Sequence, residues 1–249
     1  AIATFLVLTF PLALLETPKS RRQSVQSIIV LFKQCFPVFI ALFMYALIDN
    51  MPKFVMETAL SYDNQLYFNA LYFPAQAILL TVGFVYKPLL VRMAQMWADA
   101  EKRNRFHLVI LAIVAMVIAL TLVVIFLMGW IGIPIMSFMY GVDFEQFRGL
   151  SFIMIAAGGV TAIIDFLYQV ITVLRRQKSV MKLYVITFGF SLFVPILLID
   201  FTGLPGAVIG YLIVMTILMV LLVWEYVSIC LDLSKHPVSQ SPVSVSVDE

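Results

Sequence analysis

Residues 46–65, ALIDNMPKFVMETALSYDNQ, place three charges and a proline in an otherwise apolar stretch. Asp49, Lys53 and Glu57 follow one another at four-residue steps, so on a helix they share one stripe. A lone carboxylate in an apolar environment is costly and must face a partner or water. We therefore expect Asp49 to pair with Lys53, one turn away, and the two to line a polar passage.

One alternative to this interpretation remains. The charges could simply mark the point where a helix leaves an apolar medium, and this is the simpler interpretation of Glu57. Pro52 lies between the charges and removes the hydrogen-bond donor for the Ile48 carbonyl, which permits a bend in the helix.

A second carboxylate, Asp165, lies in the apolar segment GGVTAIIDFLYQVITVLRRQ. Tyr168 and Gln169 follow at i+3 and i+4, so the three side chains form one polar face of a helix. Such a face either lines a cavity or bonds to a neighbouring helix, and both interpretations stay open. The candidate substrate-cavity residues are Asp49, Lys53, Asp165, Tyr168 and Gln169.

The sequence contains no pattern that predicts catalysis or metal binding. The two histidines, His107 and His236, are not at metal-ligand spacing, and the two cysteines form no C-x-x-C pair. The phosphate-cradling, zinc-protease and nucleophile-elbow motifs do not occur. We expect a protein that is not an enzyme, with no catalytic residue, metal or cofactor, and no nucleic-acid partner.

Composition predicts the environment of these residues. Apolar residues make up 63% of the chain and charged residues 12%, whereas a soluble domain has about 25% charged residues. A helix needs about 20 apolar residues to cross a bilayer. The sequence therefore predicts an all-α integral membrane protein with about seven transmembrane helices, over residues 1–15, 29–49, 66–86, 107–129, 150–173, 183–200 and 206–231.

The basic residues predict the orientation of these helices, because cytoplasmic loops carry an excess of Lys and Arg. The loops after the first, third and fifth spans are basic, whereas the intervening loops carry only Lys53, only Arg148, and none. We expect the three basic loops and the Ser-, Pro- and Val-rich tail, residues 232–249, to be cytoplasmic, and the tail to be disordered.

The position of the first apolar run predicts that further spans precede it. Ala1 already lies inside an apolar run and, with this orientation, on the outer face. If the intact protein starts in the cytoplasm, an odd number of spans is expected upstream. Five would give twelve spans with both ends inside.

Three stretches of the chain resemble one family of transporters. MYGVDFEQFRGLSFIMIAAGGVTAIIDFLYQVITVLRRQKSV is similar to the middle of the second lobe of bacterial polysaccharide flippases, with an outer Y-G turn, a span with small residues and a basic exit. SYDNQLYFNALYFPAQAILLTVGFVYKPLL is similar to their eighth span, and GLPGAVIGYL resembles the hairpin before their last span. The resemblance extends from the loop after Leu15 to about Leu231.

This resemblance implies a member of the polysaccharide transporter family within the multidrug/oligosaccharidyl-lipid/polysaccharide exporter superfamily. Its members have two six-helix lobes around a central cavity. Residues 1–28 would end the first lobe and form a cytoplasmic linker, residues 29–231 would form the second lobe, and residues 232–249 would form the tail.

The family moves undecaprenyl-diphosphate-linked oligosaccharide across the bacterial cytoplasmic membrane by alternating access, for the biosynthesis of lipopolysaccharide or capsule. The implied partners are the lipid-linked oligosaccharide, membrane lipid and the N-terminal lobe. The cavity in this family is often cationic, whereas this lobe offers Lys53 and few other intramembrane cations. The diphosphate site is therefore expected mainly in the first lobe.

Other functions give different expectations. A drug or peptidoglycan-precursor exporter of the same superfamily would share the fold. A membrane glycosyltransferase or polymerase would normally carry a large extramembrane loop with paired carboxylates, and the loops here are short. A membrane scaffold would not need Asp49 and Asp165 within the bilayer.

Overall fold

The computed structural model describes residues 25–98, 103–174 and 176–235, and these residues form helices and short connections without a strand. The helices, in chain order, are α3 (Val25–Ala59), α4 (Tyr62–Tyr86), η2 (Lys87–Leu89), α5 (Leu90–Ala98), α6 (Arg103–Leu127), η4 (Met128–Gly132), α7 (Ile133–Tyr140), η5 (Phe144–Phe147), α8 (Arg148–Val173), α9 (Gln177–Thr202) and α10 (Leu204–Lys235).

Six of the described helical segments are long and apolar enough to cross a membrane. They correspond to the six spans expected between residues 29 and 231, so the all-α, multi-pass membrane fold is confirmed. The expected first span, residues 1–15, lies outside the described residues. The last helix continues to Lys235, so the first four residues of the expected tail are helical.

The first described helix is longer than its apolar run. α3 continues ten residues past the expected end at Asp49, and only Leu60 and Ser61 separate it from α4. Lys53 and Glu57 thus belong to the helix and not to a loop. Hydropathy detects only the apolar part of a helix. The helical backbone of α3 continues through the charged residues that follow this part.

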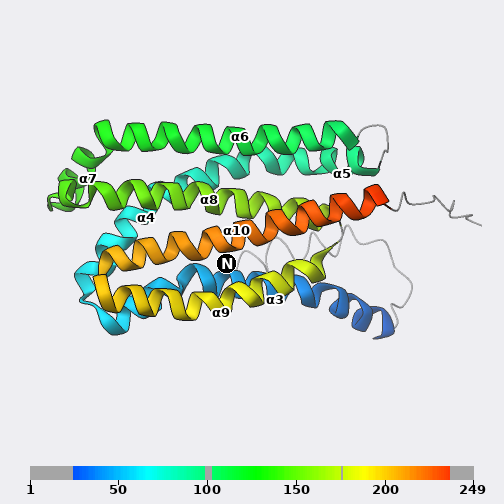
Figure 1. Ribbon diagram of the computed structural model, residues 1–249, viewed down its shortest axis with the longest axis horizontal. Helices are drawn as coiled ribbons and strands as arrows, with labels where there is room; N and C mark the ends of the chain where they lie inside the picture. The colour runs from blue at the N-terminus through cyan, green and yellow to red at the C-terminus, as the bar shows by residue number, and fades with distance from the viewer. Residues whose placement is uncertain (1–24, 99–102, 175, 236–249) are drawn as a thin grey trace, which may run out of the picture. The chain divides into compact units, whose positions relative to one another are not determined.

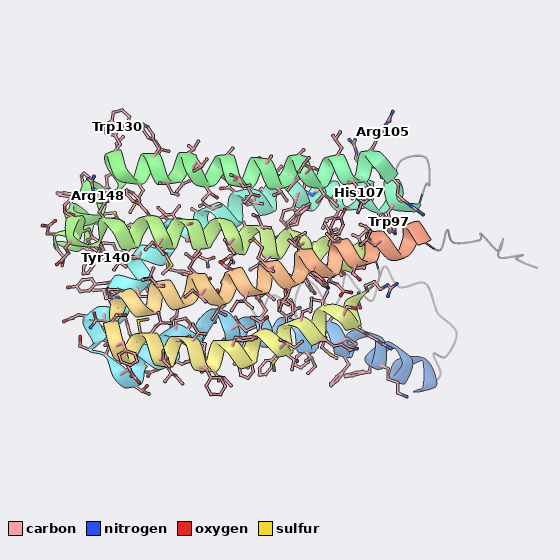
Figure 2. The ribbon with its side chains drawn as sticks, viewed as in Figure 1. Trp97, Arg105, His107, Trp130, Tyr140 and Arg148 are labelled. Atoms are coloured by element: carbon pink, nitrogen blue, oxygen red, sulfur yellow. The ribbon has the colours of Figure 1, made fainter. Side chains whose placement is uncertain are left out.

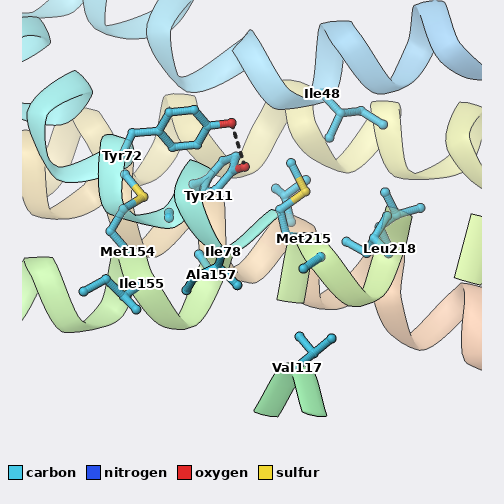
Figure 3. Close-up of a cluster of buried hydrophobic side chains, with 14 of the residues drawn as sticks. Ile48, Tyr72, Ile78, Val117, Met154, Ile155, Ala157, Tyr211, Met215 and Leu218 are labelled. Atoms are coloured by element: carbon cyan, nitrogen blue, oxygen red, sulfur yellow. Dashed lines mark hydrogen bonds between the residues drawn. The ribbon is translucent and has the colours of Figure 1, made fainter. Parts of the chain in front are cut away.

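The chain forms two compact units, residues 1–39 and 40–249. In the second unit α8 is the central helix, because it packs against α4, α6 and α10, while α9 packs mainly on α10 (Figure 1). Apolar side chains from these helices form one cluster, including Ile78 of α4, Ile155 and Ala157 of α8, and Met215 and Leu218 of α10 (Figure 3).

Two glycines in this unit allow a close helix contact and a tight turn. A Cβ added at Gly158 of α8 would lie 2.6 Å from the Cβ of Ala75 on α4, so the absence of a side chain at this glycine lets the two helices pack closely. Gly203 has a φ of 67° and is the single residue between α9 and α10, so a glycine makes this tight turn.

The two ends of the second unit carry opposite charge, and Figure 2 shows Arg105 and Trp97 at one end, with Trp130, Tyr140 and Arg148 at the other. Tryptophan and tyrosine are enriched where membrane helices meet the interface. We call the two ends the basic end and the acidic end. The basic end carries Lys87, Arg92, Arg103, Arg105, Arg176, Lys178 and Lys182, and the acidic end carries Glu57, Asp63, Asp143, Glu145 and Asp200, with Lys53 and Arg148.

The contact at Gly158 leads to a prediction about stability. Gly158→Ala should lower the free energy of unfolding in detergent by about 1–3 kcal/mol, because the added methyl group must push α8 away from α4. The matched control is Gly189→Ala on α9, where a Cβ meets nothing within 4 Å. It should leave stability unchanged or raise it by up to about 1 kcal/mol. Equal effects of the two substitutions would contradict the close packing of α4 and α8.

Candidate functional site

Asp49 connects three helices through hydrogen bonds to two tyrosines. The Tyr72 hydroxyl on α4 lies 2.9 Å and 3.0 Å from the two carboxylate oxygens, and the Tyr211 hydroxyl on α10 donates to Oδ1 at 2.7 Å. The two hydroxyls lie 3.4 Å apart (Figure 3), and their rings meet edge-on at 5.7 Å between centroids. The half-buried carboxylate is therefore satisfied by donors from neighbouring helices.

The prediction that Asp49 forms an ion pair with Lys53 is wrong. The Lys53 ammonium donates to the Asn50 side chain at 3.3 Å and lies 4.6 Å from the centroid of the Tyr72 ring. The carboxylate is short and is directed at the hydroxyls of α4 and α10, whereas the longer Lys53 side chain reaches the face of an aromatic ring. Lys53 therefore lies beside the Asp49 group and contacts it through Tyr72.

Asp165 is also bound by a tyrosine. Its carboxylate accepts a hydrogen bond from the Tyr86 hydroxyl, which connects α8 to α4. Asp165 is half-buried, so part of the carboxylate stays accessible. The Tyr86 ring packs edge-on against Phe166 at 5.4 Å, which positions the hydroxyl.

The other two members of the expected α8 face have different surroundings. The buried Tyr168 ring lies 6.2 Å from Tyr184 on α9, and the Tyr184 ring lies 5.8 Å from Tyr45 on α3. Gln169 is half-buried, and its side chain has no hydrogen-bond partner among the described residues. Tyr168 thus begins a row of three tyrosine rings from three helices, and the Gln169 amide stays free to bind a ligand.

The Asp49 and Asp165 groups belong to one polar region. The buried Thr161 hydroxyl lies 3.4 Å from that of Tyr211, and Thr161 precedes Asp165 by four residues on α8. Thr161 and Asp165 therefore lie one helical turn, about 6 Å of rise, apart on α8. The Tyr45 hydroxyl lies within electrostatic range of both carboxylates. We call this region the tyrosine–carboxylate cluster: Tyr45, Asp49, Lys53, Tyr72, Tyr86, Thr161, Asp165, Tyr168, Gln169, Tyr184 and Tyr211.

Five tyrosines of the cluster were not among the residues that the sequence singled out, although a signal for them exists. Tyrosine is typical of the membrane interface, and a tyrosine in the middle of a span needs a partner for its hydroxyl. That partner is a residue distant in sequence, so the pairing could not be derived from helical spacing. The five are Tyr45, Tyr72, Tyr86, Tyr184 and Tyr211.

The side chains of the cluster are of the kinds that bind a ligand by hydrogen bonds and ring contacts. It offers two carboxylate acceptors, aromatic rings, one free amide and a single ammonium group at its edge. Among the described residues, no group of three or more His, Cys, Asp or Glu side chains could hold a metal ion. The cluster can accept hydrogen bonds from a polyhydroxylated ligand and pack its rings against that ligand.

No protein-family model matches this chain, and no curated protein or solved structure matches it either.

The bonds at Asp49 lead to a second prediction. Tyr211→Phe should lower the free energy of unfolding by about 1 kcal/mol, because it removes one interhelical hydrogen bond inside the membrane. Tyr140→Phe is the matched control, since Tyr140 is exposed at the end of α7 and its hydroxyl has no partner among the described residues. Unfolding in detergent would measure both, and equal stability of the two variants would contradict a structural role for the Tyr211 hydroxyl.

Proposed function

We propose that this chain contributes the second lobe, preceded by the last span of the first lobe, to a transporter that flips lipid-linked oligosaccharide across the bacterial cytoplasmic membrane. The substrate is of the undecaprenyl-diphosphate type, and the process is polysaccharide biosynthesis. The proposal combines the resemblance stated above with the six membrane-spanning helices and the polar region between them.

One observation carries the proposal: two half-buried carboxylates and a free amide lie among tyrosines within membrane-spanning helices. Ionisable groups inside the bilayer are costly and usually mark substrate or ion pathways. A protein that needed only to pack its helices could satisfy the same contacts with apolar residues. The half-exposure of Asp49, Asp165 and Gln169 is compatible with a cavity completed by the first lobe.

The chemistry of the cluster favours the sugar part of such a substrate. Sugar hydroxyls donate to carboxylates, and the apolar faces of sugar rings pack on aromatic side chains. A diphosphate needs cations, and Lys53 is the one cation of the cluster. In this proposal the cluster binds the oligosaccharide, and the diphosphate is bound mainly by the first lobe.

A second candidate function follows from the same negative charge. An exporter of cationic drugs would also benefit from carboxylates beside aromatic rings, because a cation is attracted to both. Such an exporter belongs to the same superfamily, so the fold does not separate the two functions.

The proposal also includes an orientation. The basic end, with Arg92, Arg105 and Lys178 among its residues, faces the cytoplasm, and the acidic end faces outward. Labelling of engineered cysteines at each end from either side of the membrane tests this orientation.

Asp165→Asn distinguishes the candidate functions. Asparagine keeps an acceptor for the Tyr86 hydroxyl and almost the same volume, so stability should change little. The loss of charge should slow translocation of lipid-linked oligosaccharide by the full-length protein in vesicles about tenfold, equivalent to ~1.4 kcal/mol. Asp143→Asn, an exposed carboxylate at the acidic end, is the control and should not change the rate.

The same vesicles would be tested for efflux of a cationic dye. Loss of dye efflux in Asp165→Asn with unchanged oligosaccharide translocation would favour the drug exporter. Normal rates of both processes in a stably folded variant would assign Asp165 to helix packing and contradict a role in transport.

A further inference from the structure

An apolar groove runs between α6 and α8, on helices that also carry the central packing of the second unit. Its wider part, about 490 Å³, is lined by Ile125, Phe126, Gly129, Trp130, Arg148 and Phe152. A narrower part, about 210 Å³, continues from Ile125 along Thr121 and Val117 of α6 and along Gly159 and Ile163 of α8. Because Ile125 lines both parts, they form one groove.

The length of the groove matches one leaflet of a bilayer. It extends from Trp130 of η4 to Val117 of α6, which is about 20 Å along these two consecutive helices. The hydrocarbon core of a bilayer is about 30 Å thick, so the groove reaches from the interface at the acidic end to about the middle of the membrane. Trp130 and Tyr140 mark that interface (Figure 2).

The walls of the groove are apolar apart from two residues. The Thr121 hydroxyl donates to the Val117 carbonyl of its own helix and so offers no free donor. Arg148 lies at the mouth, at the first residue of α8, where the positive end of the helix dipole adds to its charge. The groove therefore combines a long apolar slot with one cationic site at the depth of the lipid headgroups.

Arg148 is available to an anion. Its guanidinium pairs with Glu145 at 2.8 Å, but the two side chains are 45% and 56% exposed, and exposed pairs of this kind contribute little free energy. A guanidinium donates two parallel hydrogen bonds to a phosphate, a geometry that suits a phosphodiester. A phosphate could therefore replace Glu145 at small cost.

We propose that this groove binds one anionic phospholipid, with an acyl chain along α6 and α8 and the phosphate at Arg148. A transmembrane helix is about 10 Å across and would need far more space than 490 Å³ over the same length. A free phosphate would use Arg148 but would leave the apolar slot empty. The site depends only on the membrane fold and not on the proposed function, because it lies on α6 and α8, outside the tyrosine–carboxylate cluster.

Photo-crosslinking tests the site directly. The full-length protein would be reconstituted in phosphatidylcholine vesicles with a trace of phosphatidylglycerol that carries a diazirine in one acyl chain, and labelled peptides would be mapped by mass spectrometry. Labelling should concentrate on residues 117–130 and 152–163. Arg148→Gln, which removes the cation, and Ile125→Trp, which fills the point shared by both parts, should each reduce it about tenfold.

Two matched variants and a second probe complete the experiment. Arg92→Gln removes an exposed arginine at the basic end, and Leu111→Trp enlarges an exposed residue of α6 outside the groove, so both should keep wild-type labelling. A diacylglycerol with the same diazirine should label the groove about tenfold less.

Three results would overturn the proposal. Equal labelling by the diacylglycerol would remove the phosphate contact at Arg148. Uniform labelling of all exposed apolar faces would mean that ordinary surrounding lipid occupies the groove. A groove that stays unlabelled while exposed faces such as that around Leu111 are labelled would mean that another polypeptide covers it.

Discussion

The structure depends on one constraint: a carboxylate inside a membrane must receive hydrogen bonds from the protein or from water. Asp49 receives them from Tyr72 and Tyr211, so a single side chain of α3 fixes the positions of α4 and α10. Asp165 repeats the arrangement with Tyr86 and fixes α8 against α4. The hydroxyl of each tyrosine is distant in sequence from its acceptor, and these bonds therefore specify which helices are neighbours as well as their register.

The same constraint brings together side chains that can bind a ligand. Helices that bury two carboxylates must surround them with donors, and tyrosine supplies both a donor and a broad ring. The result is a region in which polar atoms and aromatic rings from α3, α4, α8, α9 and α10 lie next to one another. Asp49 is bound by two donors and contributes mainly to stability, whereas Asp165 and Gln169 keep capacity for a ligand.

Much of the fold followed from the sequence because its determinants are local. Apolar runs predicted the six described spans, because hydropathy is a property of each residue by itself. The partner of Asp49 was predicted wrongly, because helical spacing identifies neighbours on one helix but contains no information about α10. The end of α3 was missed since hydropathy does not register a helix that continues through charged residues.

In the transporter that we propose, the tyrosine–carboxylate cluster faces an aqueous cavity. The most direct measurement is the reactivity of Gln169→Cys toward a small charged thiol reagent in the full-length protein, with Cys35 and Cys230 replaced by serine. Ala157→Cys, at a fully buried position of the same helix, is the reference. The account predicts that the cysteine at 169 reacts, that lipid-linked oligosaccharide slows this reaction, and that the cysteine at 157 stays unreactive. Equal lack of reaction at both positions, with and without substrate, would contradict it.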